Sequence, residues 1–326
     1  MYLVTGGAGF IGSNIVAALD EAGARIVVDD WLGHGEKWRN LAKRSLETVV
    51  PPEDLADYLQ GVRGIEAVIH MGAVSSTTEV DGDKLLENNF RLSQRLWTFC
   101  RERQIPFVYA SSAATYGDGS QGFDDDMSQD CLARLRPLNG YGWSKHLFDR
   151  WVAQQIAEGR GAPPQWAGLK FFNVYGPNEY HKGQQASVAY HLFRQIEAGE
   201  PATLFQSHNP DYPDGGQLRD FVWVGDCVDV VLWLLRSPKV SGLFNLGTGQ
   251  ARSFADLARA VFAAADRAEN IKFVPTPEAI REKYQYFTQA RMDRLRAAGY
   301  DRPFTALEEG VGRYVRDYLM QSDPYR

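Results

Sequence analysis

Short apolar runs alternate with longer amphipathic stretches through the first half of the chain. One run precedes Gly6, and others lie at residues 25–30, 67–70, 107–111 and 168–172. The stretches between them carry apolar residues three or four positions apart, at 11–19, 51–59, 84–103 and 141–152. The runs are typical of buried strands and the stretches of covering helices. This rhythm predicts an α/β fold with a doubly wound parallel sheet.

A glycine-rich turn follows the first predicted strand. Gly6, Gly9 and Gly12 are spaced three apart and lead into the first helix. A pyrophosphate binds against the first turn of a helix, where free N–H groups and the helix dipole attract anions and no side chain may intervene. The second strand ends in Asp29 and Asp30, and an acid there binds adenosine ribose hydroxyls. The pattern predicts a dinucleotide site; the alternative is a bend without a ligand.

The alternation loosens after about residue 175. The elements expected there are a helix at 186–198, a turn-rich loop at 207–216, a helix at 228–235, a strand at 243–246, helix caps at Ser253 and Thr305, and a last helix ending near residue 320. We therefore predict a Rossmann domain that binds NAD(P) at residues 1–175, with a return of about 220–250. Residues 176–326 are expected to form a smaller C-terminal substrate-binding lobe.

Composition narrows the class of protein. The chain has 326 residues and a formal net charge of −6, and it contains no basic run, which argues against a nucleic-acid partner. Cys100, Cys131 and Cys227 follow no metal or disulfide spacing, so no metal is expected. No export signal is recognised and no apolar run reaches the about 18 residues of a membrane span, so we expect a cytoplasmic protein without a membrane partner.

A second group of residues carries acid–base chemistry. Tyr141 and Lys145 stand four residues apart on one predicted helix face, and Ser112 follows the strand before them. A phenol titrates near pH 10, too high for a base at neutral pH, unless a nearby cation favours the phenolate. Lys145 and an oxidised nicotinamide both supply such a cation. Ser112 is then placed to hold the reacting oxygen.

With these motifs the chain resembles the extended short-chain dehydrogenase/reductase family over essentially its whole length. Within that family, several segments are similar to the ADP-L-glycero-D-manno-heptose 6-epimerases: residues 70–79, 109–117, 172–177, 181–183, 219–222 and 244–249. The Ser-Ser-Thr-Thr-Glu segment at 75–79 and the His-Lys-Gly segment at 181–183 are the distinguishing ones.

The resemblance implies inversion at C6 of ADP-D-glycero-D-manno-heptose through a 6-keto intermediate, which supplies heptose for the lipopolysaccharide core. C6 lies outside the sugar ring, so rotation about its bond to the ring presents the opposite face and turns the oxygen away from the first acid/base. A second proton donor is then needed. The resemblance assigns Tyr141 as the acid/base for one orientation of the C6 oxygen and Lys182 as the acid/base for the other. Desolvation brings the pKa of Lys182 towards the useful range.

The same resemblance extends both ligand sites. The expected cofactor residues are Gly6, Gly9, Phe10, Ile11, Gly12, Asp29, Asp30, Lys37, Met71, Gly72, Ala73, Val74, Ser75, Asn88, Lys145, Val174 and Lys182. The expected substrate residues are Ser76, Asn173, Gln184, His191, Phe205, Gln206, Ser207, Arg219 and Tyr284. Arg219 has independent support, because a guanidinium binds a diphosphate with two donors.

Alternatives remain for the cofactor and the reaction. The family uses NADP, and Lys37 suits its 2′-phosphate, but Asp29 and Asp30 favour NAD and Pro51-Pro52 stands where the family offers another lysine. The family also implies a homo-oligomer, specifically a pentamer. The rival functions are a UDP-hexose 4-epimerase, which does not need Lys182, and a non-catalytic NAD(P)-binding scaffold.

Overall fold

The computed structural model describes residues 1–281 and 284–326, and its centre is a parallel sheet of seven strands. The strand order is β11-β6-β5-β4-β1-β2-β3. The strands are β1 (Tyr2–Thr5), β2 (Ile26–Asp29), β3 (Thr48–Val50), β4 (Ala67–His70), β5 (Phe107–Ser112), β6 (Trp166–Phe171) and β11 (Gly242–Leu246). Each neighbouring pair is parallel. The predicted doubly wound parallel sheet is confirmed.

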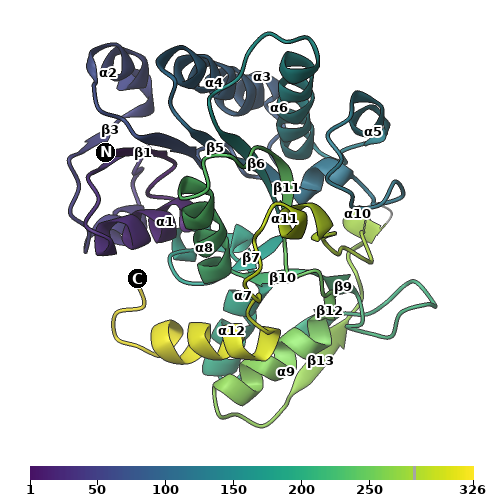
Figure 1. The fold of residues 1–326 in the computed structure, drawn as a ribbon. Coiled ribbons are helices and arrows are strands. Elements are labelled where there is room, and N and C mark those ends of the chain that lie inside the picture. Colours follow the sequence, from purple (N-terminus) through teal and green to yellow (C-terminus); the bar gives the residue numbers. More distant parts are fainter. Residues whose placement is uncertain (282–283) are drawn as a thin grey trace.

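Helices cover both faces of this sheet (Figure 1). On one side lie α1 (Phe10–Glu21) and α8 (Val224–Leu235), which pack on each other. On the other side lie α2 (Leu55–Gly61), α4 (Leu92–Arg103) and α6 (Gly140–Ala157). Because both faces are covered, the central strands are buried along their length, and this explains why they read as continuous apolar runs in the sequence.

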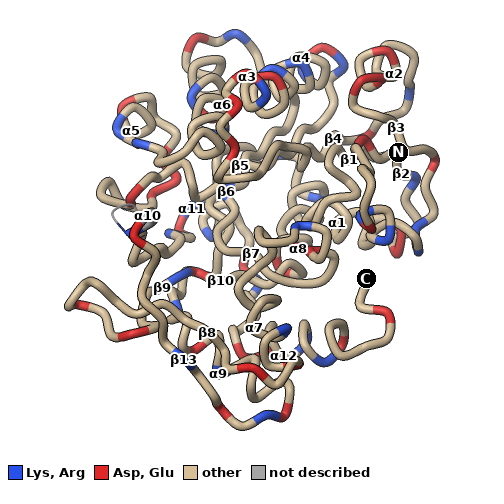
Figure 2. The backbone as a smooth tube through the Cα atoms, turned by 180° about the vertical axis from the view of Figure 1, so that it is seen from behind, with Lys and Arg blue, Asp and Glu red and all other residues tan. Residues whose placement is uncertain are grey.

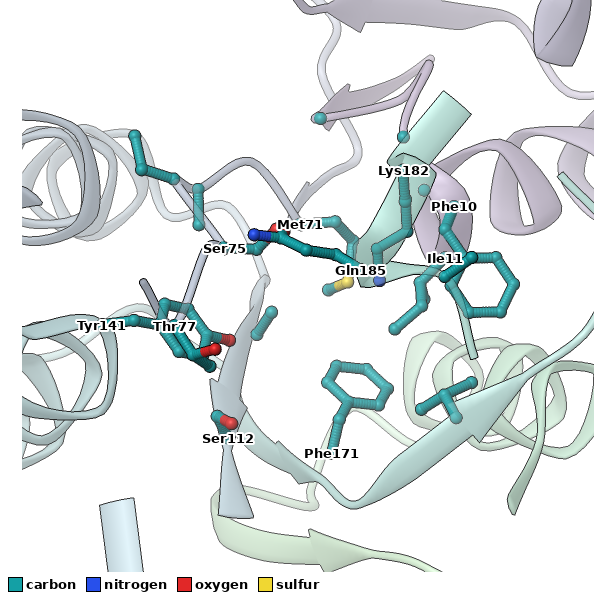
Figure 3. A pocket seen from close by; sticks show the side chains of 18 of the residues that line it. Phe10, Ile11, Met71, Ser75, Thr77, Ser112, Tyr141, Phe171, Lys182 and Gln185 are labelled. Atoms are coloured by element: carbon teal, nitrogen blue, oxygen red, sulfur yellow. The ribbon is translucent and has the colours of Figure 1, made fainter. Parts of the chain in front are cut away.

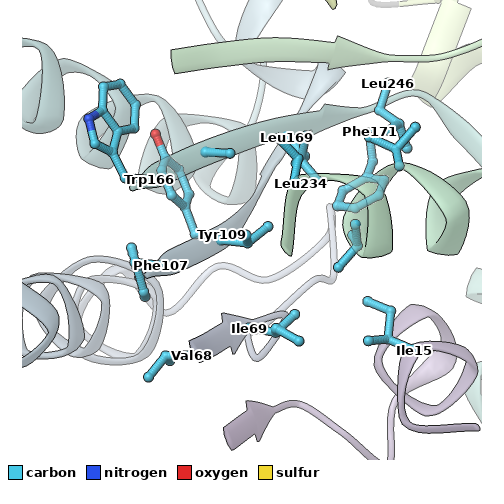
Figure 4. Packing of buried hydrophobic residues seen from close by; sticks show 14 of the residues in the cluster. Ile15, Val68, Ile69, Phe107, Tyr109, Trp166, Leu169, Phe171, Leu234 and Leu246 are labelled. Atoms are coloured by element: carbon cyan, nitrogen blue, oxygen red, sulfur yellow. The ribbon is translucent and has the colours of Figure 1, made fainter. Parts of the chain in front are cut away.

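The core between the sheet and its helices is rich in aromatic residues (Figure 4). Trp97 of α4 is fully buried and meets Phe107 and Trp166 edge-on, with ring centroids 6.1 and 5.5 Å apart. Ile15, Ile69 and Leu246 continue the same cluster towards the other strands, as Figure 4 shows. This packing fixes the carboxyl ends of the strands, where the candidate site lies.

The helix predicted at 84–103 begins earlier than expected and is not uniform. It consists of α3 (Gly82–Leu85), a π-helical turn (Leu86–Arg91) and α4. Asp81 caps its start by accepting a hydrogen bond from the Lys84 N–H. Single π-helical turns inside α-helices occur frequently at functional sites, and this one carries the buried Asn89.

A second apolar cluster gathers elements from the part of the chain that is predicted to form the smaller lobe. Its helices are α7 (Val188–Glu197), α9 (Phe254–Ala264) and α12 (Leu307–Tyr314), the last continued by a π-helical turn (Val315–Leu319). Its strand pairs are β7 (Asn173–Tyr175) with β10 (Phe221–Trp223), β8 (Ala202–Phe205) with β13 (Ile271–Val274), and β9 (Leu218–Arg219) with β12 (Arg252–Ser253). Other short α-helices, none with a described residue in this cluster, are α5 (Gln129–Arg134), α10 (Glu278–Arg281) and α11 (Asp293–Ala297).

The two predicted helix caps in this lobe have different outcomes. Ser253 and Asp256 form the expected capping box at the start of α9. The cap expected from Thr305 is wrong, because Ala306 is the N-cap of α12 and Thr305 donates its hydroxyl to Asp226 of α8. A tertiary hydrogen bond has replaced the local one.

Charged residues are spread over the described part of the chain. Basic and acidic residues alternate over the tube in Figure 2. Among the described residues, no helix combines the length and the apolar composition needed to cross a membrane.

Candidate active site

The candidate site is a cavity of about 1080 Å³ at the carboxyl ends of the central strands. The sheet order reverses between β1 and β4, and ligands of doubly wound sheets bind at such a switch point. Every residue predicted for the cofactor lines this cavity, together with Ser112, Tyr141, Asn173 and Gln184. The fold therefore brings together residues from Gly6 to Gln184 that are far apart in the sequence.

The glycine turn is required by the packing of the chain on itself. Gly6 has a φ of +64°, and a Cβ there would lie 2.5 Å from the Gly72 nitrogen. A Cβ on Gly12 would lie 2.1 Å from the Gly6 oxygen. Gly9, which has no side chain to cap with, is the N-cap of α1, so the N–H groups of the first helix turn remain available to an anion.

Two carboxylates and one lysine form the adenosine end of the cavity. Asp30 accepts hydrogen bonds from the Ala8 N–H (2.9 Å) and from Lys37 Nζ (2.6 Å). Burial, with the charges of Asp30 and Glu53, raises the pKa of Asp29 to about 7. Within the described residues, no group donates to Asp29 Oδ1, which is buried at the cavity wall. That oxygen is a ready acceptor for a ribose hydroxyl, so the site fits a dinucleotide.

Ser112 and Tyr141 face the other end of the cavity (Figure 3). Ser112 ends β5, and Tyr141 lies in the first turn of α6, whose N-cap Asn139 accepts a hydrogen bond from the Gly142 N–H at 2.8 Å. Lys145 follows one turn later and is buried. Burial lowers the pKa of Lys145 to about 8, although the charge of Asp149 opposes this shift.

The protein groups by themselves raise the pKa of Tyr141, and the expected lowering by Lys145 together with an oxidised nicotinamide stays a prediction. Burial raises the pKa of Tyr141 above 10, and a hydrogen bond with Ser112 opposes the shift only in part. The physical reason is that removing the phenolate from water costs more free energy than its protein neighbours return.

Beneath α6 lies a buried ionic network that the sequence did not reveal. Lys170 Nζ is 2.8 Å from Asp149 Oδ2, and both side chains are fully buried. Lys170 also donates to Thr115 at 2.6 Å, and Ser111 donates to Asp149 at 2.6 Å. The network ties α6, which carries Tyr141 and Lys145, to β5 and β6.

Lys182 enters the cavity from the side opposite Tyr141, next to Phe10 (Figure 3). It lies in the 3-10 helix η5 (Tyr180–Gln185), and its Nζ is 5.5 Å from the centroid of the Phe10 ring. Burial lowers the pKa of Lys182, and the nearby Glu179 opposes this shift. The site therefore presents two ionisable donors to one space from opposite walls.

The remaining predicted substrate residues lie outside the wall that the described residues form. Arg219 stacks between Phe254 and Tyr284, with its guanidinium carbon 5.5 and 5.6 Å from their ring centroids, and Phe254 itself lines the cavity. Phe205 packs edge-on against Tyr284 at 6.2 Å. The others that lie outside the wall are Ser76, His191, Gln206 and Ser207. Arg219, Phe205 and Tyr284 thus form a group adjacent to the cavity.

The comparisons with known proteins agree with this arrangement. The model of the NAD dependent epimerase/dehydratase family matches residues 2–247. The chain belongs to this family. It is 51% identical over 331 residues, covering 100% of both chains, to a protein of Nitratidesulfovibrio vulgaris (strain DP4) named ADP-L-glycero-D-manno-heptose-6-epimerase.

Two solved structures extend the comparison. The ADP-L-glycero-D-manno-heptose-6-epimerase of Helicobacter pylori matches with a TM-score of 0.77 and 27% identity, covering 97% of this chain and 95% of the other. The UDP-glucose 4-epimerase of Thermus thermophilus, in complex with NAD, matches with a TM-score of 0.74 and 27% identity over 96% of this chain and 97% of the other. Family membership and the cavity together support a nicotinamide dinucleotide cofactor in this epimerase-family chain.

The structure adds cavity residues that sequence reasoning missed: Trp31, Thr77, Thr78, His181 and Gln185. Gln185 Nε2 donates to Ser76 Oγ at 2.6 Å, a bond that links the Ser-Ser-Thr-Thr-Glu segment to the turn carrying Lys182. Asn89, the neighbour of the cavity-lining Asn88, fixes the backbone of Val74 through bonds to its N–H and C=O, at 2.8 and 2.9 Å. Both asparagines lie in the π-helical turn, with Asn88 at the cavity and Asn89 buried behind it.

Proposed function

We propose that this chain is an ADP-heptose 6-epimerase that interconverts ADP-D-glycero-D-manno-heptose and ADP-L-glycero-D-manno-heptose. The observation that carries the proposal is the placement of Tyr141 and Lys182 on opposite walls of one cavity. The name of the full-length relative, at 51% identity, supports the same substrate. A single acid/base is enough for a rigid ring position, whereas a carbon that rotates outside the ring needs a donor on each side.

In this mechanism one base takes the proton of the 6-hydroxyl, and the other returns a proton to the same oxygen after rotation. When bound, the nicotinamide would supply the oxidation of C6 to a ketone and its reduction from the opposite face, so no net redox change would occur. Ser112 holds the reacting oxygen beside Tyr141, and Lys145 adds positive charge on the same helix face. The lowered pKa of Lys182 favours proton exchange near neutral pH.

We propose NADP as the cofactor, on the strength of Lys37. Its ammonium is held by Asp30 and by the Trp31 carbonyl, at 2.6 and 2.8 Å, and an ammonium has a third donor for a 2′-phosphate. Lys37→Ala should weaken NADP binding while changing NAD binding little. Dissociation constants for both dinucleotides, measured by equilibrium titration, check this; equal losses for both would contradict it.

We also propose a division into two domains. Residues 1–175 and about 220–250 bind the cofactor, and residues 176–326 bind the ADP-sugar. Arg219 and Tyr284 are the proposed contacts to the nucleotide. A homo-oligomer in the cytoplasm, pentameric by family resemblance, also stays a prediction, and sedimentation of the purified protein tests its oligomeric state.

The decisive experiment incubates the purified protein with ADP-D-glycero-D-manno-heptose and follows the C6 configuration by proton NMR. Tyr141→Phe and Lys182→Met should each slow conversion by about 100-fold or more, because each removes one acid/base. Lys239→Met, which changes an exposed lysine that is not among the cavity-lining residues of the described chain, is the matched control and should stay near wild type. No conversion by the wild type with NADP or NAD would overturn the heptose assignment and direct the assay to UDP-hexoses.

A further inference from the structure

Residues 323–326 lie against the two short helical turns that carry Lys37 and Lys182. These turns are η1 (Glu36–Leu41) and η5, and they also pack on each other. Figure 1 shows the chain leaving α12 and turning back towards α1. A segment about 140 positions away from Lys182 in sequence thus forms the outer support of its turn.

Neither turn is stable by its local structure alone. Both are 3-10 helices of six residues, which are too short for cooperative helix stability. In η5 the regular geometry is interrupted at Gly183, directly after Lys182, where φ is +55°. The position of each lysine therefore depends on what packs against its turn.

Tyr325 supplies that packing to both turns. Its side chain is buried, and its ring meets the Tyr180 ring edge-on at 5.2 Å. On the other side, the Arg39 guanidinium carbon lies 4.6 Å from the centre of the Tyr325 ring. Tyr180 precedes Lys182 by two residues, and Arg39 follows Lys37 by two, so one aromatic ring contacts both turns next to their functional lysines.

Hydrogen bonds fix the same segment. Tyr180 donates its hydroxyl to the Pro324 carbonyl at 2.7 Å, and Lys43 pairs with Asp323 at 2.9 Å. The Arg326 N–H donates to Asn178 Oδ1 at 3.0 Å.

The Asn178 carbonyl in turn accepts from Asn40 Nδ2 at 3.0 Å, and the same Nδ2 lies 3.2 Å from His181 Nδ1. Asn40 and His181 thus connect η1 to η5 directly. Segment 323–326 bonds to Tyr180 of η5 and to Lys43 and Asn178, which flank the two turns.

We propose that residues 323–326 position Lys182 for proton transfer and Lys37 for cofactor binding, with Tyr325 as the positioning residue. The kinetic part rests on the proposed function of Lys182, whereas the packing part does not. Tyr325 lies outside the cavity wall of the described residues, so it acts through the two turns rather than on a ligand.

The test compares three variants. Tyr325→Ala removes the ring, and Tyr325→Phe keeps the ring and loses only a hydroxyl that is 3.5 Å from Glu36. Tyr300→Ala is the matched control, because Tyr300 is also a buried tyrosine but packs on Trp233 and Phe304 instead. Hydrogen–deuterium exchange, the NADP dissociation constant and epimerisation kinetics are measured for each.

Tyr325→Ala should raise amide exchange in residues 36–41 and 180–185 selectively, weaken NADP binding, and lower kcat by about 10- to 100-fold, the scale of a misplaced catalytic group. Tyr325→Phe should restore all three values, and Tyr300→Ala should leave exchange in both turns unchanged. At saturating NADP, the kcat of the double variant Tyr325→Ala/Lys182→Met should be no lower than that of Lys182→Met, since the effect of Tyr325 on kcat acts through Lys182 and the effect on Lys37 appears only in cofactor binding.

The proposal would be overturned if Tyr325→Ala raised amide exchange equally throughout the chain. It would also be overturned if the kcat losses of Tyr325→Ala and Lys182→Met multiplied in the double variant. If the wild type does not epimerise the heptose, the proposed function fails, but exchange and NADP binding still decide whether the segment positions the two turns.

Discussion

Replacing Asp29 with asparagine tests the electrostatics at the adenosine end of the cavity. Burial and two neighbouring carboxylates raise the pKa of Asp29 from 3.8 to about 7. At about 1.4 kcal/mol per pH unit, that interval corresponds to about 4 kcal/mol as an upper limit. Asparagine has the shape of the protonated acid but does not ionise, so it isolates the charge.

The sign of the effect follows from proton binding. In the unfolded chain Asp29 loses its proton near pH 4, whereas in the folded chain it keeps it until about pH 7. The contribution of Asp29 to stability is therefore fully present below pH 4 and is lost as the pH rises through 7. Between pH 5 and pH 8, the free energy of unfolding of the wild type should therefore fall by about 2 to 3 kcal/mol relative to that of Asp29→Asn.

Urea unfolding of both proteins at pH 5, 6, 7 and 8 measures this difference. Asp30→Asn is the control and should lose stability, because Asp30 holds Lys37 and the Ala8 N–H. In parallel, the NADP dissociation constant of the wild type should rise relative to that of Asp29→Asn between pH 6 and pH 8, since the wild type gains a negative charge beside the phosphate. A stability difference that does not change with pH would refute the reasoning.

Two further predictions concern the groups around α6. Lys170→Met should lower the free energy of unfolding by about 3 to 5 kcal/mol, because it leaves the buried Asp149 charge unpaired. The double variant Lys170→Met/Asp149→Leu should recover most of that free energy. A loss below about 1 kcal/mol in Lys170→Met would contradict the argument. Lys145 has a pKa of about 8, so kcat should fall as the pH rises through 8, where the ammonium loses its proton. A kcat profile with its alkaline limb at about pH 10 or above, the range of an unperturbed lysine, would show that Lys145 is not the controlling group.

The sequence by itself determined the class of the sheet and most of its strands, although it did not reveal β3. Apolar runs between amphipathic helices require a parallel sheet covered on both faces, and the strand order then brings the turn at Gly6 beside Gly72. Most of the residues predicted for the cofactor follow directly after such strands or lie at the start of the helices that follow them. The pattern alone located the glycine turn and the two acids that end the second strand, whereas the family resemblance supplied most of the other cofactor residues.

Only the tertiary structure decided which buried charges are paired, how burial shifts pKa values, and which distant segments pack against the site. Lys170 lies in an apolar run that predicts a strand and gives no indication that its ammonium pairs with Asp149, and Thr305 caps no helix because Asp226 binds it instead. Burial, which spacing does not reveal, outweighs the protein neighbours of Tyr141 and raises its pKa. Tyr325 contacts η1 and η5 across about 290 and 145 positions. Contacts between distant segments depend on how the lobes and the sheet pack, and no local pattern in the sequence encodes them.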